Sequence, residues 1–83
     1  MSGIRLPRIG SLVILHRHPS HLSPAGSELS KGYDTLPNEC GYHKAIWVMP
    51  GMGIVVDRRD SYNRIFIHER YVWFEDYQLD LVG

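Results

Sequence analysis

The sequence predicts a small all-β barrel. Short runs rich in Val, Ile and aromatic residues occur throughout residues 44–82, and such runs are typical of strands. Turn-forming residues separate them, as at Pro50-Gly51 and in the hairpin turn at 60–63. The chain has 83 residues, which is enough for one small domain. We expect the strands to close into a barrel, because closure removes sheet edges on which other chains pair.

The strands are recognised by their apolar runs. The first is expected at 10–17, where Val13, Ile14 and Leu15 form a continuous apolar run. Such a run indicates a strand buried on both faces, or one whose second face is covered by the loop that follows. A 3₁₀ turn is expected at 75–78. Further strands are expected at 44–48, 53–58, 64–68, 71–74 and 79–82.

Alternation along these strands predicts the core. Successive residues of a strand point to opposite faces, so Ile65 and Ile67 share one face and Phe66 lies on the other. For the same reason only one of Trp73 and Phe74 is expected to point inward. The residues expected in the core are Val13, Leu15, Ile54, Val56, Ile65, Ile67, Leu79 and Leu81.

Two segments lie outside the expected strands. Residues 1–9 form an N-terminal arm, in which Gly3 and Pro7 disfavour regular structure. Residues 18–43 contain three prolines and three glycines and show no helical or strand period. A loop of this length is either functional or disordered. We therefore expect an extended arm at 1–9 and a barrel at 10–83 with an irregular loop at 18–43.

The composition argues against several classes of protein. Lys and Arg together number nine, as do Asp and Glu, so the chain has no general attraction to nucleic acid or to an anionic membrane. No apolar run reaches the ~20 residues that a membrane-spanning helix needs. The single cysteine, Cys40, rules out an intramolecular disulfide. We expect an intracellular protein with no membrane segment and no cofactor.

Five residues around the long loop are of types that ligate zinc: His16, His18, His21, Cys40 and His43. Their spacing matches no standard zinc motif, so exposed histidines and one buried free thiol are the favoured interpretation. Cys40 and His43 could also act as nucleophile and base. However, the sequence indicates neither a rigid scaffold nor an oxyanion site for them. We therefore expect neither a metal site nor an enzyme.

Aromatic residues make up 11% of the chain. Tyr and Trp are common anchors of protein interfaces, and aromatic grooves bind extended peptides. Stacking of the rings on nucleic-acid bases is an alternative, for which Arg58 and Arg59 would supply a small basic patch. We favour a protein interface, formed by Ile4, Leu6, Ile9, Tyr33, Tyr42, Trp47, Tyr62, Tyr71 and Trp73.

Four motifs follow one another along the chain: Gly10-Ser-Leu-Val, Gly53-Ile-Val-Val-Asp, Arg64-Ile-Phe-Ile and Val72-Trp-Phe-Glu-Asp-Tyr-Gln-Leu-Asp-Leu-Val. Their order resembles that of small SH3-like β-barrel proteins carried by tailed bacteriophages. The resemblance covers residues 10–17 and 51–82 and implies a five-stranded SH3-like barrel. The chain departs from those proteins in its arm and in its long loop, where we expect its individual function to lie.

The resemblance implies a non-catalytic structural or assembly protein of a phage virion. It would be a capsid decoration (cement) protein, a head–tail connector or a tail accessory protein. Its partners would be other virion proteins or copies of itself, with no small-molecule substrate, and it would reside in the virion and, during assembly, in the host cytoplasm. Two alternatives stay open: a small regulatory binder of a host enzyme or polymerase, and a nucleic-acid-binding barrel.

Overall fold

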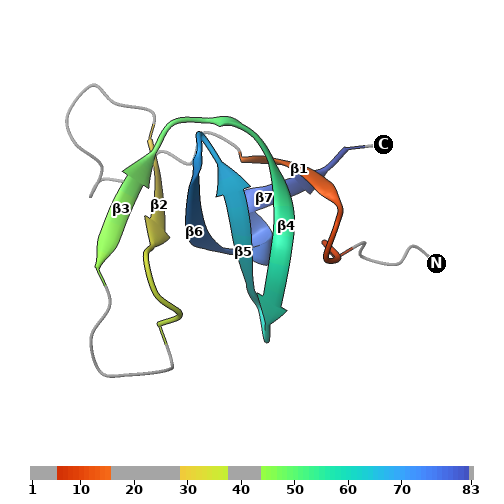
Figure 1. The fold of residues 1–83 in the computed structure, drawn as a ribbon, viewed down its shortest axis with the longest axis horizontal. Helices are drawn as coiled ribbons and strands as arrows, with labels where there is room; N and C mark the ends of the chain where they lie inside the picture. Colours follow the sequence, from red (N-terminus) through yellow and green to blue (C-terminus); the bar gives the residue numbers. More distant parts are fainter. Residues whose placement is uncertain (1–5, 16–28, 38–43, 83) are drawn as a thin grey trace.

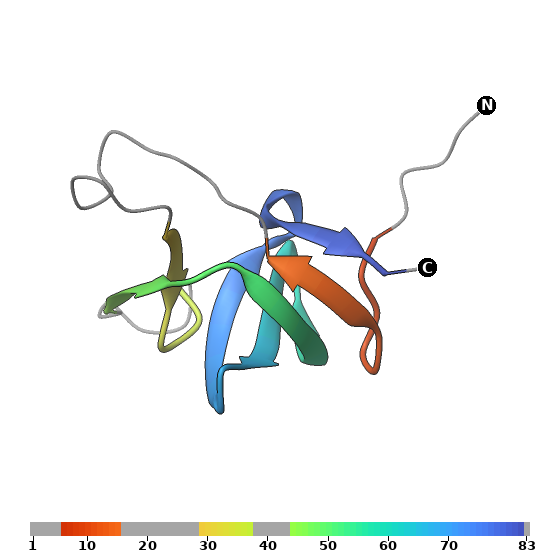
Figure 2. The same ribbon diagram turned by 90° about the horizontal axis from the view of Figure 1, so that it is seen from above.

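One antiparallel sheet of seven strands makes up the fold in the computed structural model, which describes residues 6–15, 29–37 and 44–82 (Figure 1). The strands lie in the order β3-β2-β6-β5-β4-β1-β7, and the sheet curls on itself as half of a barrel (Figure 2). The elements are β1 (Leu12–Leu15), β2 (Ser30–Tyr33), β3 (Ala45–Val48), β4 (Gly51–Arg59), β5 (Tyr62–Ile67), β6 (Arg70–Glu75), the 3₁₀ turn η1 (Asp76–Gln78) and β7 (Leu79–Leu81).

The prediction of an all-β fold is confirmed, and the part of the chain that the structure describes contains no α-helix. The sheet has seven strands, however, and not the five expected of the barrel. Strands β1 and β3 to β7 overlap the predicted segments, and η1 lies within the predicted 3₁₀ turn. The strands β3 and β7 are the two ends of the sheet order.

Strand β2 lies inside 18–43, where the prediction of an irregular loop without strands was wrong. Its sequence, Ser-Lys-Gly-Tyr, has little intrinsic preference for a strand. Pairing with β3 along its whole length, and with β6 at Tyr33 and Trp73, holds it extended. Gly32 allows β2 to lie close to the Phe74 side chain of β6, because a Cβ atom at Gly32 would be 2.8 Å from Cε1 of Phe74. Tertiary packing therefore determines this strand more than its own residues do.

The predicted orientation of β4 was also wrong. Ile54 and Val56 are 42% and 37% exposed, whereas Val55 is 1% exposed and belongs to the core. Gly53 lies on the same inner side as Val55, and a Cβ atom there would lie 2.8 Å from the carbonyl oxygen of Phe66. Only glycine fits this position, so the inward face of β4 consists of Gly53 and Val55. A β-bulge between Val55 and Asp57 then shifts the pairing with β5 by one residue.

The core lies on the inner side of the curled sheet. The predicted core residues Val13, Leu15, Ile65, Ile67 and Leu79 are buried, whereas Leu81 is half-buried and packs against the cluster. Among the described residues, the cluster consists of Val13, Leu15, Val48, Val55, Ile65, Ile67, Val72, Phe74 and Leu79.

The prediction that only one of Trp73 and Phe74 points inward is confirmed, although both are buried, at 8% and 0% exposure. Phe74 points into the core, while Trp73 lies on the opposite face of β6, in register with Tyr33 of β2. The unpredicted strand β2 extends the sheet beyond β6 at this place. The side-chain amide nitrogen of Gln78 in η1 donates to the carbonyl oxygen of Lys31 at 2.9 Å and ties β2 to the 3₁₀ turn.

The core assignment makes a prediction about strand β5. Replacing Ile65 or Ile67 with Ala should lower the free energy of unfolding by about 2–5 kcal/mol, because each change leaves a cavity in a well-packed core. Phe66→Ala is the matched control from the outer face and should cost clearly less. Urea unfolding of the three variants measures this, and a larger loss for Phe66→Ala than for Ile65→Ala would contradict the orientation of β5.

Candidate interaction surface

Six apolar side chains from four neighbouring strands lie together on the outer side of the sheet. The pairing register places Leu12 next to Ile54, Ile54 next to Phe66, and Phe66 next to Tyr71. A second, shorter row pairs Ile14 with Met52. Their exposed fractions range from 41% to 56%. We call this surface the outer apolar face: Leu12, Ile14, Met52, Ile54, Phe66 and Tyr71.

The outer apolar face has a shallow hollow and an aromatic pair. The hollow measures about 270 Å³ and lies between β1, β4 and β5, lined in part by Leu12, Met52 and Phe66. The rings of Phe66 and Tyr71 have centroids 5.0 Å apart with planes tilted by 49°, a geometry that stabilises aromatic pairs. The guanidinium of Arg64 lies 4.7 Å from the centroid of the Tyr71 ring. A charged group thus borders this apolar surface without interrupting it.

The turn between β5 and β6 forms one end of this surface. His68 and Glu69 both have positive φ angles, 51° and 62°, as the two central residues of a type I′ hairpin turn do. Nε2 of His68 lies 3.0 Å from the carbonyl oxygen of Met49. This contact connects the β5–β6 turn to the segment before β4 and helps to position the wall of the hollow.

Sequence reasoning found only part of this surface. Among the predicted interface residues that the structure describes, only Tyr71 belongs to the outer apolar face. The other five members were missed, although one signal was available: the runs Leu12–Leu15 and Gly53–Val56 are apolar without alternation. A strand that is apolar at every position has an apolar side chain on both faces. One of the two faces must then be covered by another element or meet solvent.

The other predicted interface residues that the structure describes lie on separate parts of it and do not form one surface. Leu6 and Ile9 are exposed, at 50% and 64%, on the segment before β1, where Pro7 between them is buried. Trp47 is half-buried in β3, and Trp73 is buried. Tyr33 and Tyr62, both half-buried, lie close to η1. Ile4 and Tyr42 lie outside the described residues.

Three tyrosines and one glutamate gather near η1. Tyr62 is in register with Glu75, which immediately precedes η1. Burial raises the pKa of Tyr62 above its ordinary value of 10.0, and the negative charge of Glu75 and the neighbouring Tyr33 and Tyr77 add to this. Burial, followed by Glu75 and Tyr33, also raises the pKa of Tyr77. These two hydroxyl groups therefore stay protonated and uncharged at physiological pH.

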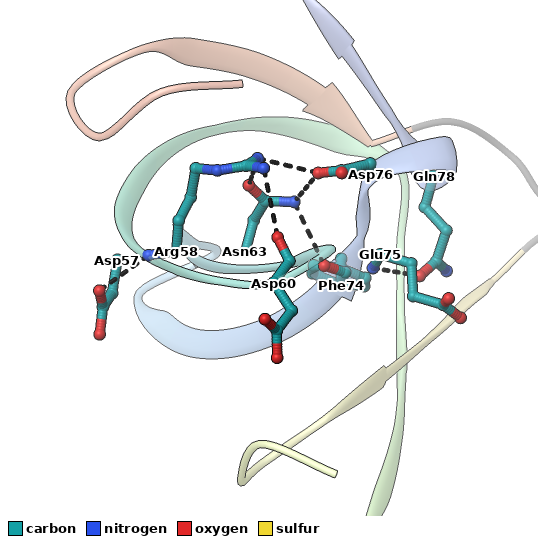
Figure 3. Close-up of polar contacts among 8 residues, drawn as sticks. All are labelled: Asp57, Arg58, Asp60, Asn63, Phe74, Glu75, Asp76 and Gln78. Carbon is teal, nitrogen blue, oxygen red and sulfur yellow. Dashed lines mark hydrogen bonds and ion pairs between the residues drawn. The ribbon is translucent and has the colours of Figure 1, made fainter. Parts of the chain in front are cut away.

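A partly buried polar network lies beside η1 (Figure 3). Arg58 donates through Nη1 to Oδ1 of Asn63 at 2.6 Å and to Oδ1 of Asp76 at 2.9 Å. Asn63 is fully buried and donates from Nδ2 to Oδ1 of Asp76 at 2.7 Å. Arg58 also donates to the carbonyl oxygen of Asp60 at 3.4 Å. These contacts join β4, β5 and η1.

The polar network includes Arg58, one of the two arginines of the predicted basic patch. The Arg58 side chain is 21% exposed and forms an ion pair with Asp76, so its charge is largely committed within the chain. Arg59 is more exposed, at 55%, with Nε 3.9 Å from Oδ2 of Asp57. The two arginines therefore do not form one basic surface.

The five residues considered for zinc, His16, His18, His21, Cys40 and His43, lie outside the described residues. Within 6–15, 29–37 and 44–82, no group of three or more His, Cys, Asp or Glu residues is arranged to hold a metal ion. In the same ranges, no helix has the length and apolar character needed to cross a membrane.

Comparisons with known proteins identify no relative: no protein-family model, curated protein or solved structure matches the chain. The function of the chain is therefore inferred from the geometry of the described residues.

The polar network makes a prediction about stability. Asp76→Ala leaves the half-buried Arg58 without its carboxylate partner and should lower the free energy of unfolding by about 1–3 kcal/mol. Arg59→Ala removes a side chain that is 55% exposed and whose ion pair with Asp57 is long, and it should change the free energy of unfolding by less than about 0.5 kcal/mol. Urea unfolding of both variants measures this, and equal losses would show that the network is not structural.

Proposed function

We propose that the protein is a non-catalytic binding protein that acts through protein–protein contacts made by its outer apolar face. The observation that carries the proposal is the unbroken register of Leu12, Ile54, Phe66 and Tyr71 across four strands. The largest contiguous apolar patch on a soluble protein is often the site at which it binds a partner.

The composition of the surface supports a protein partner. It contains aromatic rings and a methionine and no charged side chain, which matches the centre of protein interfaces. The neighbouring Arg64 lies at its border, as polar groups do at the rim of an interface. A hydrophobic core surrounded by polar residues is the arrangement that excludes water from anchor residues.

The setting of this function follows from the resemblance to small phage barrels. We propose a structural or assembly role in a virion, with other virion proteins or copies of the chain as partners. The exposed Leu6 and Ile9 on the segment before β1 offer further apolar contacts for such a role. A regulatory binder of a host protein would use the same outer apolar face, so it is the second candidate. Arg58 is hydrogen-bonded to Asp76 and Asn63, which disfavours nucleic-acid binding through Arg58 and Arg59.

Site-specific photo-crosslinking tests the proposed contact. A benzophenone side chain placed at Phe66 should give a discrete protein adduct in the cells that make the protein, because Phe66 lies within the outer apolar face. Tyr77 is the matched control: it is aromatic and 61% exposed but lies on η1, outside this face. The same probe at Tyr77 should give little or no such adduct. Absence of a discrete adduct at Phe66, or equal adducts at both positions, would contradict the proposal.

A further inference from the structure

We infer that the outer apolar face binds a second copy of the same chain, forming a two-fold symmetric dimer in which two sheets pack face to face. This inference rests on the proposed function and specifies its partner. Three properties support it: the area of the face, the distribution of its side chains and the net charge of the chain.

The area of the face suits a dimer interface. If each large side chain is given about 150–200 Å², the lower part of the range for aromatic residues, the six residues, which are 41–56% exposed, offer on the order of 450 Å². A typical specific interface takes about 800 Å² from each partner, of which about 65% is apolar in homodimers, or roughly 500 Å². The outer apolar face therefore supplies nearly all of the apolar surface that one half of a standard dimer interface needs.

The two halves of the face complement each other. The half on β1 is aliphatic, with Leu12 and Ile14, and the half on β5 and β6 is aromatic, with Phe66 and Tyr71. Strand β4 lies between them and carries Ile54 at the centre. A two-fold axis parallel to β4 places the aliphatic half of one copy on the aromatic half of its partner.

This axis also suits the packing of sheets. Two sheets that pack face to face keep their strands within about 30° of each other, and rotation about an axis parallel to β4 preserves the strand direction. The hollow beside Phe66, about 270 Å³ in volume, provides room for side chains of the second copy. In such an isologous interface each residue contact occurs twice.

Charge does not oppose the pairing. The chain has a formal net charge of zero at pH 7, so two copies do not repel each other as strongly charged proteins do. None of the six residues of the face is charged, and the nearest charged groups, Arg64 beside Tyr71 and Asp80 in register with Ile14, lie at its edges. The centre of the interface would therefore bury no uncompensated charge, which would otherwise cost several kcal/mol.

The test is the mass of the purified protein across a concentration series from about 1 μM to about 500 μM, measured by light scattering and sedimentation equilibrium. The dissociation constants of interfaces of standard size range from micromolar to picomolar, so this concentration series detects even the weakest of them. We expect the mass to reach twice the 9.6 kDa of one chain. Ile54→Lys places a charge at the centre of the face and should weaken self-association by on the order of 100-fold or more.

Tyr77→Lys is the matched control, because it adds the same charge at an exposed site outside the face. It should leave the dimer unchanged. Circular dichroism on Ile54→Lys establishes that the variant is folded, and if it is not, Phe66→Ser serves in its place. Dimerisation of the wild type that Ile54→Lys or Phe66→Ser does not weaken would overturn the inference.

Failure of this inference is distinguishable from failure of the proposed function. A wild-type chain that stays monomeric at about 500 μM, while the probe at Phe66 captures a different protein, overturns the dimer and leaves the binding function standing. A monomeric chain that gives no adduct at Phe66 overturns both.

Discussion

The close approach of β4 to β5 at Gly53 is the constraint on which the rest of the structure depends. A Cβ atom at this position would lie 2.8 Å from the Phe66 carbonyl oxygen, a separation that side chains do not tolerate. The position therefore has to face inward with no side chain at all. Strand alternation then directs Val55 into the core and Met52 and Ile54 outward. A register shifted by one residue would exchange the two sets.

This orientation of β4 gives the protein two apolar surfaces instead of one. The inner surface is filled by the side chains of six strands and forms the core. The outer apolar face uses alternate residues of β1, β4, β5 and β6, so these strands carry apolar side chains on both faces at this place. Burial of apolar area is favourable by roughly 25 cal/mol per Å². Covering the outer apolar face with a partner would therefore be favourable, and the proposals on function and dimerisation follow from this.

The parts that the sequence predicted are those determined locally. Apolar runs and turns located β1 and β3 to β7, and the alternation within β5 placed Ile65 and Ile67 correctly. Strand β2 was missed because Gly32 is extended only through its neighbours on β3 and β6. The orientation of β4 was missed because Ile54, Val55 and Val56 are alike in character, so composition alone does not assign their faces. The same ambiguity concealed most of the outer apolar face.

The most direct test of this account compares two adjacent residues of β4. Heteronuclear NMR spectra of Ile54→Asp and Val55→Asp report whether each variant keeps a dispersed, folded pattern. Val55 is 1% exposed and Ile54 is 42% exposed, and a buried unpaired carboxylate is far more costly than an exposed one. We expect Val55→Asp to unfold the chain and Ile54→Asp to keep the fold. A folded Val55→Asp together with an unfolded Ile54→Asp would show that the inner and outer faces are reversed.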